Sequence, residues 1–131
     1  MPSERTTTKA HFYIIVQGGR MHPLYYFQHG LPTQNTSSLQ WEGMDSANRR
    51  VKPIPGRGID IARSPLEAAS MLTAVPKDRV YLIFQLYEDS FAAFDILKPL
   101  VIRAGLDYTW EPRRQGEDMI LGPGGQAPGP Q

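Results

Sequence analysis

A short basic stretch in the first half of the chain carries the residues best suited to recognise a charged ligand. Its members are Arg49, Arg50, Lys52, Arg57 and Arg63. With Trp41 nearby, a loop folded back on itself could combine charge with base stacking, as RNA-binding and single-strand-binding surfaces do. The whole chain is nearly neutral, however, with 14 basic and 13 acidic side chains, and nucleic-acid binders usually carry a larger basic excess. We therefore interpret the stretch as a solvated loop and keep nucleic-acid binding as the alternative function.

No set of side chains forms a recognisable catalytic or metal-binding pattern. The chain has no cysteine, which excludes disulfides and thiolate chemistry. His11, His22 and His29 have no carboxylates at ligand spacing nearby, so we expect surface or half-buried imidazoles. Ser90 follows an apolar run and precedes a helical one, where a nucleophile could lie, but Glu-Asp-Ser-Phe is typical of a helix N-cap. We expect a protein without enzymatic activity, cofactor or metal.

Two tryptophans complete the set of candidate binding residues. Most aromatic side chains of this chain fall inside apolar runs, and we expect them in the core. Aromatic side chains that stay exposed would mark a binding face instead. The candidate binding residues are Trp41 and Trp110, together with the basic residues Arg49, Arg50, Lys52 and Arg57.

The first half of the chain predicts strands separated by turns. The expected strands are Phe12–Gln17, Leu24–His29 and Leu39–Met44. Gly18-Gly19 predicts a turn, and a hairpin between the first two strands is possible. Residues 30–38 read as polar turn material. Residues 45–63 predict a long surface loop, with a short extended stretch at Ile59–Ile61.

The second half predicts two helices alternating with strands. Ser64-Pro65-Leu66-Glu67 has the pattern of a capping box, so a helix should begin here and run to about Ala74. The apolar run Arg79–Tyr87 is typical of a strand buried on both faces. A second helix should span Phe91 to Ala104, with Gly105 after its end and a kink at Pro99. Final strands are expected at Leu106–Glu111 and, on an edge, at Met119–Leu121.

These elements predict an α+β two-layer sandwich. We expect one mixed sheet of four to five strands, two helices on one face and a C-terminal β-α-β unit. A single domain should span residues 11–121, between a disordered N-terminal arm (1–10) and a disordered Gly/Pro-rich tail (122–131). The strand order within residues 11–63 stays open.

The segment Arg79–Pro112 resembles a known pattern. It places Tyr81, Leu82, Phe84, Asp89, Ser90, Phe91, Phe94, Gly105, Tyr108, Trp110, Glu111 and Pro112 in the order of a "YLxF…DSF…F…G…Y…WEP" motif. In this half, the chain resembles a group of short uncharacterised proteins of planctomycete-type bacteria and the periplasmic domain of ExbD/TolR-type proteins. The membrane helix of true ExbD/TolR proteins has no counterpart here. The resemblance therefore implies a fold and no transport activity.

The expected function is that of a non-catalytic protein-interaction module. Such a module would bind an unidentified partner protein, or itself, through a sheet face or an exposed edge strand. The first ten residues are polar, and no apolar run approaches the roughly 20 residues of a membrane span. We therefore expect a cytoplasmic protein that does not act at a membrane.

Overall fold

A computed structural model describes residues 9–43 and 48–121 of the chain. The predicted tail (122–131), most of the predicted arm (1–10) and Met44 lie outside the described residues. Ala10, which the sequence analysis placed in the arm, is the first residue of a strand.

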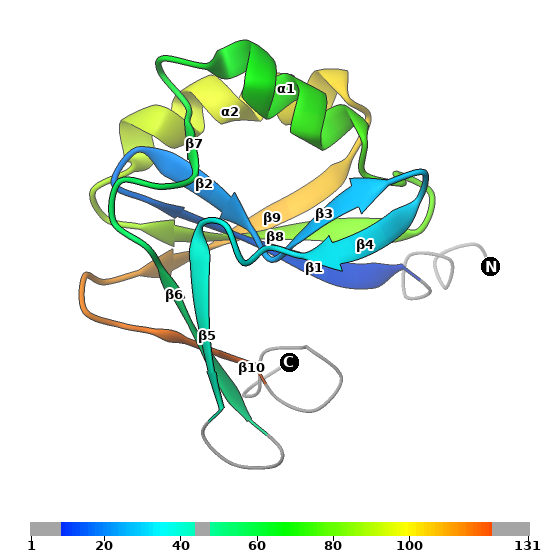
Figure 1. Ribbon diagram of the computed structural model, residues 1–131. Helices are drawn as coiled ribbons and strands as arrows, with labels where there is room; N and C mark the ends of the chain where they lie inside the picture. Colours follow the sequence, from blue (N-terminus) through cyan, green and yellow to red (C-terminus); the bar gives the residue numbers. More distant parts are fainter. Residues whose placement is uncertain (1–8, 44–47, 122–131) are drawn as a thin grey trace, which may run out of the picture.

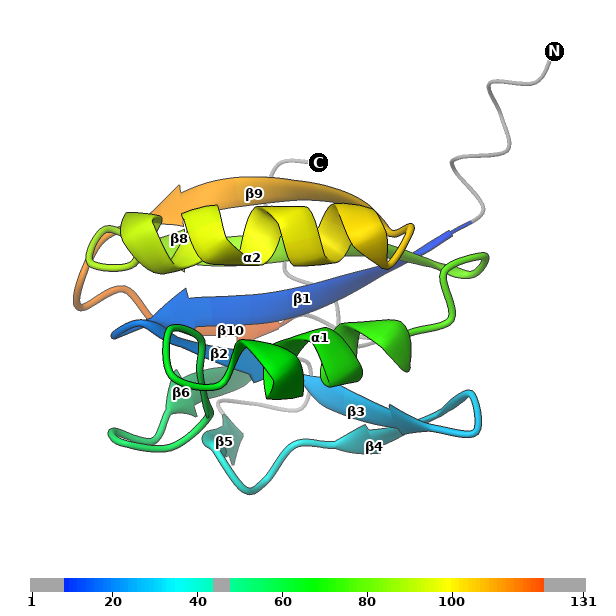
Figure 2. The same ribbon diagram turned by 90° about the horizontal axis from the view of Figure 1, so that it is seen from above.

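The centre of the fold is a five-stranded mixed sheet with the order β7-β2-β1-β8-β9 (Figure 1). Its strands are β1 (Ala10–Gln17), β2 (Arg20–Pro23), β7 (Ile59–Asp60), β8 (Val80–Tyr87) and β9 (Asp107–Arg113). β1, β8 and β9 are parallel, whereas β2 is antiparallel to both β1 and β7. Helices α1 (Pro65–Thr73) and α2 (Phe91–Arg103) cover one face of this sheet (Figures 1 and 2). The predicted α+β class, with a mixed sheet and two helices, is confirmed.

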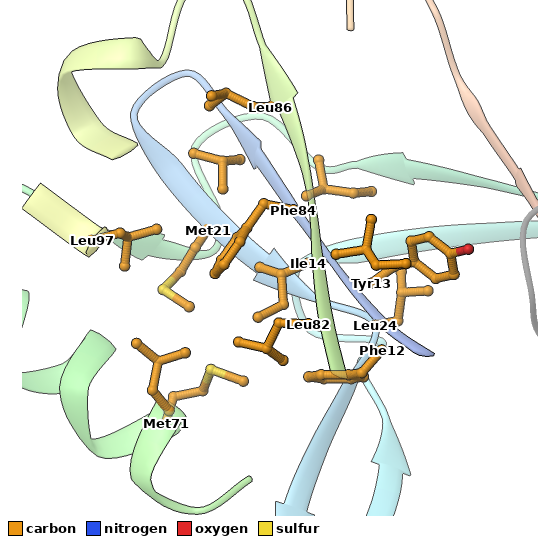
Figure 3. Close-up of a cluster of buried hydrophobic side chains, with 14 of the residues drawn as sticks. Phe12, Tyr13, Ile14, Met21, Leu24, Met71, Leu82, Phe84, Leu86 and Leu97 are labelled. Carbon is orange, nitrogen blue, oxygen red and sulfur yellow. The ribbon is translucent and has the colours of Figure 1, made fainter. Parts of the chain in front are cut away.

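The main core lies between this sheet and the helices. Successive strand residues point to opposite faces, so Ile14 of β1 and Phe84 of β8 face the helices, where they meet Met71 and Leu97 (Figure 3). All four side chains are at most 9% exposed. The sequence predicts this arrangement, because β8 is apolar at nearly every position and must be covered on both faces.

A three-stranded sheet lies on the side of the main sheet away from the helices (Figure 1). Its strands are β5 (Leu39–Gly43), β6 (Arg49–Pro53) and β10 (Met119–Leu121), in the order β10-β6-β5. The expected edge strand at Met119–Leu121 is confirmed. The short extended stretch expected at Ile59–Ile61 is confirmed by β7, but the predicted long loop over residues 45–63 is wrong at residues 49–53. β6 lies within it because Val51, fully buried between its basic neighbours, gives the segment an inner face.

A separate hairpin follows β2 and corrects a second prediction. It consists of β3 (Tyr25–Gln28) and β4 (Leu31–Gln34), joined by His29 and Gly30, both with positive φ. The expected strand Leu24–His29 therefore does not pair with β1. The expected polar turn over residues 30–38 contains β4 instead. The Gly18-Gly19 turn is present, but the strand that it pairs with β1 is β2.

Both helices begin at the predicted serines, although neither serine hydroxyl caps its helix. Ser90 Oγ instead accepts a hydrogen bond from the Gly19 N–H at 3.0 Å and donates one to Asp89 Oδ1 at 2.7 Å. Asp89 Oδ1 also accepts from the Gly18 N–H at 3.0 Å. The start of α2 thus fixes the β1–β2 turn. α2 continues as one helix through Pro99, which lies on its exposed side.

Candidate functional site: a groove beside the open edge of β1

A cavity of about 540 Å³ lies between the first half of β1 and the β3–β4 hairpin. Its lining is mainly apolar and includes Phe12, Leu24, Phe27, Pro32, Pro76 and Val80. A size of 300 to 1,000 Å³ and a predominantly apolar wall are typical of ligand-binding pockets. We call this cavity, with the strand edges that border it, the β1–β3 groove.

The groove exists because β2 is shorter than β1. β2 pairs only with residues 14–17, and the chain then turns away at Leu24. The Leu24 N–H still donates to the Tyr13 carbonyl at 3.2 Å, while the Leu24 carbonyl accepts from the Asn35 N–H at 2.9 Å, on the side of β4. Among the described residues, Ala10, His11 and Phe12 therefore have a strand partner only on the side of β8. Figure 2 shows β3 diverging from β1 beyond this point.

The backbone of His11 faces this open side. The Ala10 N–H donates to the Arg79 carbonyl at 2.9 Å, so the backbone of Ala10 points toward β8. The Tyr13 carbonyl, three residues on, points the opposite way, toward Leu24. Since alternate residues of a strand direct their polar groups to alternate sides, the N–H and C=O of His11 point into the groove.

The opposite border of the groove is also an open strand edge. The Leu24 carbonyl bonds to β4, so the alternation along β3 turns the backbone groups of Tyr25 and Phe27 away from β4. Pro32, opposite Phe27, has no N–H and needs none in this register. Tyr25 and Phe27 both line the cavity. The groove is therefore bordered by two incompletely paired strands.

Aromatic contacts and one cation shape the walls. The rings of Phe12 and Phe27 meet edge to face, with centroids 5.2 Å apart. The ring of Tyr25 packs against that of Trp41, with centroids 6.0 Å apart. An Arg79 guanidinium nitrogen lies 3.4 Å from the Gly30 carbonyl oxygen, at the hairpin turn. Within the described part of the chain Arg79 makes no ion pair, so its positive charge is available to a ligand.

The predicted basic residues do not form one surface. Arg49 stacks on Trp41, with its guanidinium carbon 5.1 Å from the ring centroid. Arg50 points to the other face of β6, near carboxylates of Glu42 (3.9 Å) and Asp118 (3.5 Å).

The remaining predicted positions are dispersed. Lys52 faces Gln40 of β5 across the ladder. An Arg57 guanidinium nitrogen donates to the Ser37 carbonyl at 3.2 Å. Trp110 lies on β9 and packs against α2. Of the predicted set, the structure brings only Arg49 and Trp41 into direct contact, so the basic stretch forms no single binding surface.

A smaller cavity of about 250 Å³ lies beside His22, with Arg20 and Arg57 in its wall. His22 is 2% exposed, which corrects the expectation of a surface or half-buried imidazole; His11 and His29 are exposed. The His22 pKa is lowered from 6.5 to about 4, mainly by burial and to a smaller extent by the Arg20 charge, while a backbone hydrogen bond with Ser38 raises it. His22 is therefore a neutral core residue at pH 7.

Comparison with protein-family models, with curated proteins and with solved structures finds no match for this chain. Within residues 9–43 and 48–121, no group of three or more His, Cys, Asp or Glu side chains could hold a metal ion. None of the described helices is long and apolar enough to cross a membrane.

Proposed function

We propose that this chain is a non-catalytic protein-interaction module that binds an extended peptide segment of a partner protein in the β1–β3 groove. One observation carries the proposal: the open backbone edge at His11 borders a mainly apolar cavity of about 540 Å³. Addition of a strand to an open sheet edge is a recurrent mode of peptide recognition, in which the backbone supplies affinity and side-chain pockets supply specificity.

The groove suggests which segments would bind. An extended peptide can exchange two backbone hydrogen bonds with His11, each contributing about 0.5–1.5 kcal/mol. Its side chains alternate, so every second one would enter the apolar space beside Phe27 and Pro32. An acidic residue of the partner could pair with Arg79. The predicted motif is an alternating apolar segment with one nearby carboxylate.

A selection from random peptides tests this function with defined probes. Twelve-residue peptides displayed on phage would be selected on the full chain, and the recovered sequences synthesised and titrated by calorimetry. We expect alternating apolar residues and an acidic position among them. Phe27→Asp should weaken binding at least about tenfold, because an uncompensated charge in the groove wall costs more than 1.4 kcal/mol.

The hairpin itself supplies a matched control. Leu31, on β4 of the same hairpin, is 69% exposed and is absent from the cavity wall, so Leu31→Asp should leave the affinity unchanged. Equal losses in both variants, or peptides whose affinity ignores Phe27→Asp, would contradict the proposal. Binding of fatty acids in place of any peptide would assign the groove to a small apolar ligand.

The resemblance of Arg79–Pro112 to ExbD/TolR-type proteins stays part of this proposal and concerns the fold alone. What supports it is the order of elements, since this segment forms the strand–helix–strand unit β8–α2–β9. The groove lies mainly outside this unit, on elements of the first half of the chain. The proposed peptide binding therefore does not depend on the resemblance.

A further inference from the structure

β9 is the long open edge of the main sheet. It pairs with β8 on one side, and no strand of the described chain lies on the other. Five of its seven residues are exposed. The opposite edge, β7, has only two residues. An exposed edge of this length is a template for pairing with another strand.

The outward-facing backbone groups of β9 can be assigned. The Arg113 carbonyl accepts from the Glu88 N–H at 3.1 Å, so Arg113 faces β8. Alternation then turns the backbone groups of Tyr108, Trp110 and Pro112 outward. Pro112 sits where its missing N–H costs no bond to β8. The open edge thus offers two N–H donors, from Tyr108 and Trp110, and three carbonyl acceptors.

These groups fit a second copy of the same strand, except that Pro112 offers no N–H to the Tyr108 carbonyl opposite it. Antiparallel pairing about a two-fold axis at Trp110 aligns Trp110 with itself and sets each Tyr108 N–H against the carbonyl of Pro112. The same register places Asp107 opposite Arg113 at both ends, and opposite charges at directly facing positions stabilise a sheet. No like charges face each other, because Thr109 stands opposite Glu111.

Exposed apolar side chains flank this edge on the helix side. The Trp110 ring packs against Phe91 and Phe94, with both centroid distances 6.1 Å. Trp110 is nevertheless 43% exposed, Phe91 47% and Ile102 65%. Helical spacing places Phe91 and Ile102 on one side of α2. A second copy joined at β9 would bring two such flanks together.

We infer that two copies of this chain associate through an antiparallel β9–β9 pair, centred on Trp110. The pairing joins the two sheets into one ten-stranded sheet with all helices on one face. This inference goes beyond the proposed peptide binding and does not depend on it. β8 separates β9 from β1, so each copy keeps its own groove open.

Cysteine cross-linking tests both the association and its register. The chain has no cysteine, so an introduced thiol is unique. In the inferred register, residue 109 of one copy faces residue 111 of the other as a non-hydrogen-bonded pair, with Cα atoms about 4.5 Å apart. That separation permits a disulfide. The experiment mixes full-length Thr109→Cys and Glu111→Cys chains, oxidises them mildly, and compares each variant alone and Ser70→Cys, exposed on α1.

The inference predicts rapid formation of the mixed disulfide, at least about fivefold faster than either variant alone or Ser70→Cys. Sedimentation velocity of the unmodified chain should show a concentration-dependent dimer, which keeps the test valid if a variant folds poorly. Equal cross-linking rates in all mixtures would overturn the register. A monomer at all concentrations would overturn the association. Neither result bears on peptide binding in the groove.

Discussion

Acidification should destabilise this protein through His22 in a window that its buried position defines. The imidazole is 2% exposed, and its pKa in the folded chain is about 4, against 6.5 for a free histidine. Between these values the unfolded chain binds a proton that the folded chain does not. The free energy of unfolding therefore falls as the pH falls from 6.5 toward 4, and the contribution is fully present above 6.5.

The magnitude follows from the size of the pKa shift. Each unit of difference corresponds to about 1.36 kcal/mol, so the loss attributable to His22 at pH 4 is about 3 kcal/mol. The assay is urea unfolding followed by tryptophan fluorescence at a series of pH values from 4 to 8. His22→Asn removes the titrating group, and its free energy of unfolding should depend less on pH in this window by that amount.

A matched control separates His22 from the other titrating groups. The exposed His11 supplies this control, because His11→Asn makes the same substitution outside the core. The quantity to compare is the difference in the free energy of unfolding between the two variants at each pH, because the carboxylates contribute equally to both. Parallel pH profiles for the unmodified chain and His22→Asn would refute the reasoning, whatever the absolute stability of the variant.

Two further substitutions test contacts that position the fold. A Cβ at Gly58 would lie 2.6 Å from His22 Cε1, and the residue has φ +90°, whereas Gly56 has φ +78° and open space around it. Gly58→Ala should therefore destabilise the chain by about 1–3 kcal/mol more than Gly56→Ala, measured by urea unfolding; equal effects would mean that only the backbone strain matters. Ser90→Ala removes the acceptor of the Gly19 N–H and should cost about 1–3 kcal/mol, since Ser90 is 1% exposed. Helix content measured by circular dichroism should stay unchanged, and a loss of α2 would show that Ser90 acts as a cap after all.

The second half of the fold could be read from the sequence because its signals are local. The apolar side chains of β8 can be buried only if both faces of the strand are covered. The apolar stripe of α2 covers one of these faces. The helix starts were located correctly from the cap positions, although Ser90 uses its hydroxyl for the β1–β2 turn. Local pattern fixes where an element begins, while the partner of a side chain depends on the tertiary structure.

The first half resisted prediction because its pairing is not local. The sequence does not show that the chain turns away from β1 at Leu24, since Leu24 belongs to the same apolar run as Tyr25, Tyr26 and Phe27 of β3. β6 could not be predicted from the sequence for another reason, because Val51 is the only apolar residue among its first four positions. The groove depends on the first of these features. Its residues could be found only once the register of β2 was known.

Hydrogen exchange at His11 tests the central claim most directly. In the free chain the His11 N–H faces the groove and should exchange fast, whereas the Ala10 N–H, bonded to the Arg79 carbonyl, should exchange slowly. Exchange of both amides would be followed by NMR with and without a saturating selected peptide. Our account predicts that the peptide slows His11 by at least about tenfold and leaves Ala10 nearly unchanged. A peptide that binds tightly while the His11 amide exchanges as before would contradict strand addition at β1.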